Sequence, residues 1–336
     1  MLNTAIVNLS LLQKNALNVK SKLKNSKLCA VVKANAYGHG AEMVANALYG
    51  IADCYAVALP EEGIALRLSG IKKDILVLIP PTPVDIALSI EYDLTLSVEN
   101  IRQVSYIYNY CKQRGKKCKV HVKVNTGMNR LGVDNLADLK RLLDYCCGKK
   151  EIIIDGVFTH YGNPQDKKCF EKATEQFLLA NALVKGYNNK VTAHASASGG
   201  FLQGAYFDMV RVGILLYGYL PFESSFSVSP IMKVYAPVVR DREVYSGQNF
   251  LYGDKIAKEP FSAGLVRFGY ADGFSRESIQ GQFNTRCMDV CLEKNAFNKK
   301  YFPVMTDAEL LAKRYNTISY EILTKSTIRS QIIYTY

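Results

Sequence analysis

Short apolar runs alternate with amphipathic segments along the first two thirds of the chain. A continuous apolar run bounded by turn residues is typical of a buried strand, and apolar residues spaced three and four apart are typical of a helix packed against it. The predicted strands are Leu28–Lys33, Tyr55–Leu59, Ile75–Ile79, Leu94–Val98, Cys118–Val124, Ile153–His160, Val191–Ala195 and Met209–Leu215. The predicted helices between them are Ala41–Leu48, Glu61–Leu68, Val84–Ile90, Glu99–Arg114, Asn135–Cys146 and Cys169–Lys185, whereas the last connection, Ser198–Tyr206, is too short for a long helix.

This alternation predicts an α/β fold. Eight buried strands with intervening helices, over about 220 residues, is the number expected of a (β/α)8 TIM-type barrel. A doubly wound sheet of eight strands is the structural alternative, and periodicity alone does not exclude it.

The pattern changes after Tyr219. The segment Pro221–Pro230 is rich in serine and proline and is typical of a linker. Beyond it the apolar runs are short, for example Val234–Val239 and Gly264–Phe268, and a helical pattern returns only at Asp307–Lys313. These features predict a small, mostly-β domain.

We therefore expect two domains, a barrel over residues 1–220 and a mostly-β domain over residues 221–336. The residues before about 10 are expected to add a strand, Ala5–Val7, to the second domain, ahead of a helix at Leu11–Leu23.

The net charge and the arrangement of the basic residues indicate which kinds of molecule the chain can bind. The chain has 336 residues, 49% of them hydrophobic, and a formal net charge of +12. The basic residues stand in short groups such as Lys116-Lys117, without interleaved aromatic residues, which disfavours nucleic-acid binding. The charge is better suited to attracting anionic small molecules, such as a phosphorylated cofactor.

Cysteine and histidine usage indicates the compartment and argues against a metal. Nine cysteines, an odd number without CxxC pairs, are typical of reduced thiols in a cytoplasm. The four histidines do not cluster with cysteines at ligand spacing, so no metal site is expected. No apolar stretch approaches the length of a membrane span, and the first residues lack a signal-peptide pattern, so we expect a cytoplasmic protein without a membrane partner.

The most informative stretch is an apolar run that ends in a lysine. Leu28–Val32 leads directly into Lys33, and small or glycine-rich residues follow as far as Gly40. A lysine held at a strand end in such surroundings is desolvated, so its pKa falls and it can serve as nucleophile, Schiff-base partner or general base.

Barrel enzymes collect their catalytic groups at the carboxyl ends of the strands. Five such ends carry polar groups, in the segments Lys33–Tyr37, Lys123–Gly132, Thr159–Tyr161, His194–Gly200 and Asp208–Ile214. Phosphate sites in barrels lie after the last two strands, where Ser198 and the amides of Gly213 and Ile214 can cradle an anion. A lysine, a phosphate cradle and an aromatic partner for a ring together indicate pyridoxal 5'-phosphate.

The segment Ala30–Gly40 resembles the cofactor-lysine motif of the alanine racemases, bacterial enzymes that depend on pyridoxal phosphate. The resemblance continues through most of the chain. It includes Lys123–Gly132, Thr159-His160, Met209–Gly218, Leu251-Tyr252-Gly253-Asp254, Gly269–Gly273, Cys287-Met288-Asp289 and Thr317–Glu321. Because a related family of single-domain pyridoxal-phosphate carriers has a similar lysine motif, the tyrosine and Met-Asp motifs of the second domain are what select the racemases.

The resemblance implies a two-base mechanism. Lys33 would hold the cofactor as an aldimine and, once an amino acid displaces it, act as the base on the D-side face. Tyr252 of the partner subunit would be the base on the L-side face, because racemisation needs one group on each side of a planar carbon. A tyrosine is a poor base at neutral pH, and the resemblance implies that His194 beside Tyr252, with Arg211 beside His194, favours its phenolate.

Arg211 would face the pyridine nitrogen of the cofactor. A guanidinium does not give up its proton, so it leaves that nitrogen largely unprotonated and the ring a weaker electron sink. Related decarboxylases have an acidic residue there, so Arg211 favours racemisation over decarboxylation.

The resemblance gives the remaining residues supporting roles. The phosphate ligands would be Tyr37, Ser198 and Tyr320 with the amides of Gly213 and Ile214. His160 would stack on the pyridine ring, Arg130 would lie beside the phenolic oxygen and the substrate carboxylate, and Lys123 matches a lysine that many members carbamylate to position that arginine. Met288 and Tyr270, supplied across a homodimer, would line the substrate pocket and favour alanine.

Some positions depart from the family pattern. Ala197 stands where an asparagine is usual, Asn125 where an aspartate is usual, and Thr285 where an arginine is expected, in a shortened segment before Cys287. We expect these changes to affect substrate range and rate rather than the chemistry.

The sequence thus predicts a homodimeric alanine racemase with composite active sites, which supplies D-alanine for peptidoglycan in the cell wall. One alternative is a racemase of broader amino-acid specificity. A second alternative, from another class, is a non-catalytic pyridoxal-phosphate carrier, which Tyr252, Met288 and the whole second domain disfavour.

Overall fold

The computed structural model describes residues 3–252, 256–276 and 286–336, in two compact units. The barrel unit consists of Leu12–Ala36 and Ala41–Val228, and the sheet unit of Met1–Leu11, Tyr37–Gly40 and Ser229–Tyr336. The barrel unit ends at Val228 rather than at residue 220, and the short segment Tyr37–Gly40 belongs to the sheet unit, as an insertion in the sequence of the barrel unit.

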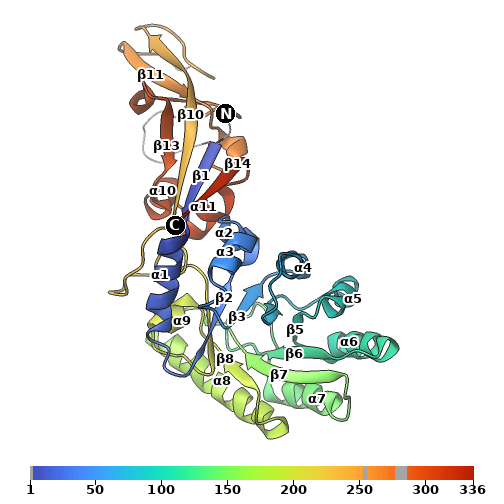
Figure 1. The fold of residues 1–336 in the computed structure, drawn as a ribbon. Coiled ribbons are helices and arrows are strands. Elements are labelled where there is room, and N and C mark those ends of the chain that lie inside the picture. Colours follow the sequence, from blue (N-terminus) through green and yellow to red (C-terminus); the bar gives the residue numbers. More distant parts are fainter. Residues whose placement is uncertain (1–2, 253–255, 277–285) are drawn as a thin grey trace. The chain divides into compact units, whose positions relative to one another are not determined.

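Eight parallel strands form the centre of the barrel unit (Figure 1). They are β2 (Lys27–Val31), β3 (Cys54–Val57), β4 (Ile75–Val77), β5 (Thr95–Val98), β6 (Cys118–Lys123), β7 (Ile152–Phe158), β8 (Thr192–His194) and β9 (Met209–Val212). From β2 to β8 each strand pairs with the next along the chain, and β9 pairs with β2. The amide of Asp208 donates to Ala193 O at 3.0 Å and that of Arg211 to Ser196 O at 2.9 Å, which brings the last two strands together.

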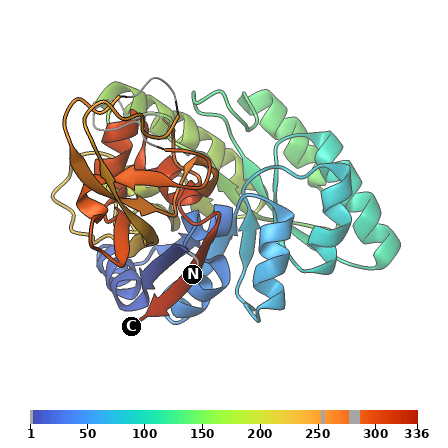
Figure 2. The same cartoon turned by 90° about the horizontal axis from the view of Figure 1, so that it is seen from above.

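This order confirms the predicted (β/α)8 barrel and rules out the doubly wound alternative, in which the strand order reverses part-way across the sheet. The helices are α1 (Leu9–Lys20), α3 (Ala41–Ala47), α4 (Pro60–Leu68), α5 (Pro83–Glu91), α6 (Ile101–Arg114), α7 (Leu136–Cys146), α8 (Lys167–Tyr187) and the short α9 (Ser198–Leu202). Helices α4 to α8 lie outside the strands (Figures 1 and 2). Capping residues determine where these helices begin and end. At the start of α6 the side chain of Asn100 accepts from the Gln103 amide, and at its end Gly115 adopts a left-handed φ of +63°.

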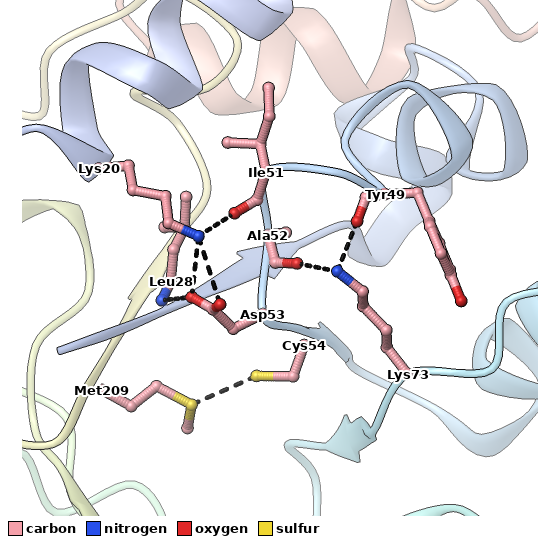
Figure 3. A network of polar contacts seen from close by, with 9 residues as sticks. All are labelled: Lys20, Leu28, Tyr49, Ile51, Ala52, Asp53, Cys54, Lys73 and Met209. Carbon is pink, nitrogen blue, oxygen red and sulfur yellow. Dashed lines mark hydrogen bonds and ion pairs between the residues drawn. The ribbon is translucent and has the colours of Figure 1, made fainter. Parts of the chain in front are cut away.

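Lysine side chains tie together the amino ends of the first barrel strands (Figure 3). Lys20 Nζ donates to Ile51 O at 2.5 Å and reaches the Asp53 carboxylate at 3.3 Å, and Asp53 Oδ2 accepts from the Leu28 amide at 2.7 Å. Lys73 Nζ donates to Ala52 O at 2.6 Å. These bonds satisfy backbone groups where β2 and β3 begin, at the end of the barrel opposite to the carboxyl ends of its strands.

The first barrel strand ends earlier than predicted. The sequence analysis extended it to Lys33, but β2 ends at Val31, and only the Val32 amide continues the ladder, by donating to Ala56 O at 2.9 Å. The segment α2 (Lys33–Tyr37) then turns left-handed, with φ of 51–53° at Ala34, Asn35, Ala36 and Tyr37. Because such a conformation costs an L-residue roughly 1–2 kcal/mol, this turn needs specific contacts to persist.

The sheet unit contains the strands β1 (Asn3–Asn8), β10 (Met232–Val244), β11 (Phe261–Val266), β12 (Cys291–Glu293), β13 (Tyr301–Met305) and β14 (Ser330–Thr335). The order is β12-β11-β10-β1-β14, with β13 also paired to β10. Strand β1 runs antiparallel to β10 and parallel to β14, so the first and last strands of the chain lie side by side (Figure 1). Its helices are α10 (Ala308–Tyr315) and α11 (Ser319–Lys325), with single turns η1 (Tyr270–Asp272) and η2 (Lys294–Ala296).

The glycines of the Tyr37–Gly40 insertion are required by close packing within the sheet unit. Gly38 has φ +83°, and a Cβ there would collide with the carbonyl oxygen of Leu323 in α11. Gly40 has φ +91°, and a Cβ there would collide with the hydroxyl of Tyr334 in β14. Only glycine combines these backbone angles with such close neighbours.

Candidate functional site

Basic side chains gather at the carboxyl ends of the barrel strands. Lys33 follows β2, Lys123 ends β6, His160 follows β7 and Arg211 lies in β9, while Arg130 stands in the loop after β6. The charges of Lys33, Lys123, Arg130 and Arg211 each lower the pKa of at least one other member of the group. The barrel therefore brings together the five basic residues that the sequence analysis picked out at separate strand ends.

Burial lowers the pKa of Lys33, and the positive charge of Arg130 lowers it further, whereas the carboxylate of Glu62 opposes this change. The side chain is half-buried. A lowered pKa increases the fraction of free amine at neutral pH, which is the form that attacks a carbonyl or accepts a proton.

Lys123 is more strongly perturbed. Burial, followed by the charges of Arg130 and Arg211, lowers its pKa to about 8. Its Nζ donates to Leu78 O at 3.2 Å and lies 5.3 Å from the centre of the Phe158 ring. A substantial fraction of this buried amine is therefore neutral near physiological pH.

His160 is held as a neutral imidazole. Burial lowers its pKa to about 3, with further contributions from Arg211 and Arg130. His160 lines a small pocket together with Lys123, Thr126, Met128, Arg130 and Thr159. The pocket thus has basic walls and a neutral ring that can pack against a ligand.

Arg211 is buried and its terminal nitrogens are all engaged within the barrel. Nη1 donates to His194 Nδ1 at 2.7 Å and to His194 O at 3.0 Å, and Nη2 donates to Thr159 O at 2.7 Å and to Ala195 O at 3.0 Å. Burial lowers its pKa to about 10, still well above neutral. A guanidinium has five N–H groups, so after these four bonds the Nε–H is its remaining donor.

A chain of two histidines continues from Arg211 across the barrel. His194 Nε2 lies 2.7 Å from His121 Nδ1, and His121 Nε2 lies 3.6 Å from the Asp155 carboxylate. Because a guanidinium only donates, His194 Nδ1 must accept and its proton must sit on Nε2. His121 then accepts through Nδ1 and carries its own proton on Nε2, facing Asp155, so all the hydrogen bonds of the chain point the same way.

This arrangement differs from the expected contact between His194 and Tyr252. Both ring nitrogens of His194 are already bonded inside the barrel, and the residue is completely buried. A hydrogen bond from Tyr252 to His194 would require one of these two bonds to break. His194 instead orients Arg211.

The candidate phosphate cradle lies beyond β8 and β9. The amide of Gly213 lies 3.4 Å from Ser198 Oγ, and Ile214 is the next residue along the chain. All three residues are buried. A hydroxyl and two successive amides placed in this way match the donor set that a phosphate requires.

Two other predicted phosphate ligands meet within the sheet unit. The rings of Tyr37 and Tyr320 have centres 5.9 Å apart and are tilted by 50°. Burial raises the pKa of Tyr37, and raises that of Tyr320 to about 12, so both hydroxyls remain protonated donors at neutral pH. Tyr320 lies on α11, a helix that the sequence analysis did not foresee.

Three residues expected to act across a dimer are exposed on the sheet unit. The exposed fractions are 70% for Tyr252, 53% for Met288 and 40% for Tyr270. The neighbouring motif residues Gly253 and Asp254, and Thr285 in the shortened segment, lie outside the described residues.

Asn125, which stands where the family usually has aspartate, organises the loop that carries Arg130. Its Oδ1 accepts from the amides of Gly127 at 3.1 Å and Asn129 at 3.0 Å, and its Nδ2 donates to Asp134 at 2.8 Å. These bonds need both an acceptor and a donor, which an amide supplies and a carboxylate does not.

The sequence analysis did not identify three residues that bond to neighbours of the predicted site residues. His121 and Asp155 extend the chain from Arg211, and Glu62 bonds to the backbone directly after Lys33. His121 stands two residues before Lys123 in the same strand, a period that places both on one face, and this signal could have indicated it. Asp155 and Glu62 carry no comparable signal.

Comparisons with known proteins agree with the geometry. A sequence profile described as "Alanine racemase, N-terminal domain" matches residues 7–221. The chain belongs to the alanine racemase family. It is 30% identical to the alanine racemase of Francisella philomiragia, covering 94% of each chain, and 31% identical to that of Ligilactobacillus salivarius, covering 98% of this chain and 97% of that one.

Solved structures of the alanine racemase family share the fold. The alanine racemase of Clostridium difficile 630 has a TM-score of 0.92 and 28% identity, covering 100% of this chain and 96% of that one. The alanine racemase of Bacillus anthracis, solved with bound L-Ala-P, has a TM-score of 0.91 and 27% identity, covering 99% and 95%. The similarity extends over both units of the chain.

Two further searches of the described residues bear on other functions. No group of three or more histidines, cysteines, aspartates or glutamates is arranged there to hold a metal ion. In the same part of the chain no helix is both long and apolar enough to cross a lipid bilayer.

Proposed function

We propose that the chain interconverts L-alanine and D-alanine with pyridoxal phosphate as cofactor, and that it supplies D-alanine for peptidoglycan in a bacterial cytoplasm. The observation that carries the proposal is the group of Lys33, Lys123, Arg130 and Arg211 around a neutral His160. Membership of the alanine racemase family supports the same reaction.

The residues present fit pyridoxal phosphate. Burial lowers the pKa values of Lys33, Lys123 and His160, and neighbouring positive charges lower them further, an excess of positive charge that an anionic ligand would relieve. Ser198, Gly213 and Ile214 would supply phosphate donors, and Lys33 would supply an amine that can bond to the aldehyde. We assign two further phosphate donors, Tyr37 and Tyr320, from the family resemblance.

Arg211 would hold the pyridine nitrogen through its remaining Nε–H. Its other donors are fixed by His194, Thr159 and Ala195, so the guanidinium is oriented before any ligand arrives. Because this group does not transfer its proton, it would leave the ring nitrogen unprotonated, which would favour proton exchange over loss of the carboxylate.

Bound pyridoxal phosphate withdraws electrons from the amino acid and so makes its Cα–H bond acidic. Lys33, with a lowered pKa, accepts or returns the proton on one face. Tyr252 of a second copy acts on the opposite face, and its exposure of 70% in one chain supports this assignment. Arg130 binds the substrate carboxylate, while the exposed Met288 and Tyr270 cover the side chain and favour the small methyl group of alanine.

Chiral analysis of amino acids incubated with purified protein and pyridoxal phosphate tests the proposal. L-Alanine, L-serine and L-lysine are supplied in parallel, and we expect D-alanine to form fastest. A larger yield of D-serine or D-lysine would support a racemase of broader specificity. No D-amino acid from protein that retains its cofactor would support a carrier and contradict the proposal.

A further inference from the structure

The carboxylate of Glu62 bonds to the ends of two barrel strands at once. Its Oε2 accepts from the amides of Ala58 at 2.7 Å and Leu59 at 3.1 Å, after β3. Its Oε1 accepts from the amide of Ala34 at 2.5 Å, after β2. Glu62 thereby connects the segment that follows Lys33 to the neighbouring strand.

Only part of this arrangement is explained by helix capping. Glu62 occupies the third position of α4, where an acidic side chain commonly reaches back to the amides at the start of its own helix. The bonds from Oε2 fulfil that function. The bond from Oε1 leaves the helix altogether and contacts the residue next to Lys33.

The Ala34 amide is where the left-handed turn begins. Ala34 has φ 51° and ψ 51°, and the next two residues have similar angles. Further along, the Ala36 amide donates to Val32 O at 2.8 Å, and Asn35 Oδ1 accepts from the Ala41 amide at 2.8 Å. The bond to Glu62 fixes the near end of a turn that L-residues do not adopt readily.

We propose that Glu62 is a positioning residue that fixes the direction of the Lys33 amine by holding the Ala34 amide. A charged acceptor for a backbone amide bonds more strongly than a neutral one, so it is suited to maintaining a strained backbone. The role of Lys33 as cofactor-bonding residue rests on the proposed function, whereas the anchoring of Ala34 does not.

Glu62→Gln separates the two parts of the arrangement. The glutamine carbonyl can still accept from Ala58 and Leu59 and cap the helix. Its NH2 group then faces the Ala34 amide. Because both groups are hydrogen-bond donors, the bond that holds Ala34 is lost. Glu61→Gln is the matched control, because Glu61 is exposed at the adjacent position of the same helix and the change in charge is the same.

Two measurements on the cofactor-free protein distinguish positioning from simple electrostatics. The first is the apparent pKa of Lys33, from the pH dependence of its labelling by an amine reagent, read by peptide mass spectrometry. The charged groups that act on this amine are Arg130, which lowers its pKa, and Glu62, which raises it. Because Glu62 raises the pKa of Lys33, its neutralisation should lower that pKa and increase the free amine at neutral pH.

The second measurement is the rate at which Lys33 becomes linked to added pyridoxal phosphate, trapped with borohydride. If Glu62 acted only through charge, the larger free-amine fraction of Glu62→Gln would speed this reaction. Positioning predicts the opposite, a decrease of about 10-fold or more, the amount expected for loss of a hydrogen bond to a charged group. Glu61→Gln should match the wild type in both measurements.

A linkage rate in Glu62→Gln equal to or faster than that of the wild type would overturn the proposal. If wild-type Lys33 itself fails to link, the proposed function fails instead. A measurement on the wild type tests the anchor without any variant: the exposed Ala34 amide should exchange its hydrogen at least about 10-fold more slowly than an unbonded amide. Exchange at the unprotected rate would also overturn the proposal.

Discussion

Arg211 donates to Nδ1 of His194 across 2.7 Å, and this bond sets the tautomer of His194. Burial and the charge of Arg211 lower the pKa of His194 well below its ordinary value. A buried neutral histidine can then accept from Arg211 on one side and donate to His121 on the other. The orientation of Arg211 is therefore built into the barrel wall.

We expect His194 to remain neutral, with its proton on Nε2, over about pH 5 to 8. Nitrogen-15 NMR of histidine-labelled protein measures this directly, because the two tautomers differ in chemical shift. The chain has only four histidines, so the spectrum contains few signals. His194→Gln identifies the resonance by its loss. A His194 signal that titrates near the ordinary histidine pKa would contradict the assigned direction of the chain.

Acid should destabilise the cofactor-free protein before its carboxylates titrate. The pKa of His160 is lowered to about 3 and that of His194 is also lowered, so the unfolded state binds more protons than the native state below the ordinary value near 6.5. Stability therefore falls as pH decreases from about 7 to 5, by at most about 1.4 kcal/mol per pH unit for each histidine. Urea unfolding measures the slope.

His160→Gln is the control for this pH dependence. It removes one of the two perturbed histidines, so the slope of stability against pH should become smaller. The same slope in wild type and variant would show that other groups cause the loss of stability.

Ser198→Ala should weaken the binding of the phosphorylated cofactor selectively. The hydroxyl of Ser198 lies beside the Gly213 amide, where we place the phosphate. Loss of a hydrogen bond to a charged group corresponds to a decrease in affinity of about 10-fold or more. Binding of pyridoxal, which has no phosphate, is the control and should not change. An equal decrease for both compounds would indicate a general disturbance of the site.

Gly38→Ala should destabilise the sheet unit. The new Cβ would meet the Leu323 carbonyl oxygen at a residue with φ +83°, and neither backbone group can move aside cheaply. We expect a loss of about 2 kcal/mol or more in the free energy of unfolding. Gly50→Ala, whose Cβ would have no atom within 4 Å, is the control and should cost little. Equal stability of the two variants would contradict the packing described for the Tyr37–Gly40 insertion.

Much of the barrel could be predicted because its strands are buried on both faces. Continuous apolar runs such as Leu28–Val32 and Ile75–Ile79 are recognisable from residue type alone, and each predicted strand overlaps an observed one. The end of the first strand could not be predicted, because the left-handed turn after Lys33 depends on Glu62, which is distant in sequence. Residue patterns report local preference, whereas such a turn is stabilised by tertiary contacts.

The candidate site was predictable where a strand end marks it, as at Lys33, Lys123 and Arg211. Arg211 was expected beside His194 from the family resemblance, but His121 was not, since a histidine ring can bond on either side and only the fold shows that His121 occupies the second nitrogen. Helix α11 was missed as well, because its seven residues are too few for a clear helical period.

The central claim is that Lys33 of one copy and Tyr252 of another act on opposite faces of the same alanine. Tyr252→Phe should retain the cofactor yet lose nearly all conversion of L-alanine to D-alanine, and Lys33→Ala should be inactive through loss of the other base.

Mixing these two inactive variants and allowing subunits to exchange is the most direct test. A mixed dimer has one site with both defects and one site with none, so random exchange should restore about a quarter of wild-type racemisation. Restoration to that extent is the predicted result. A mixture that exchanges subunits and stays inactive would show that both bases belong to one chain, and would contradict the account.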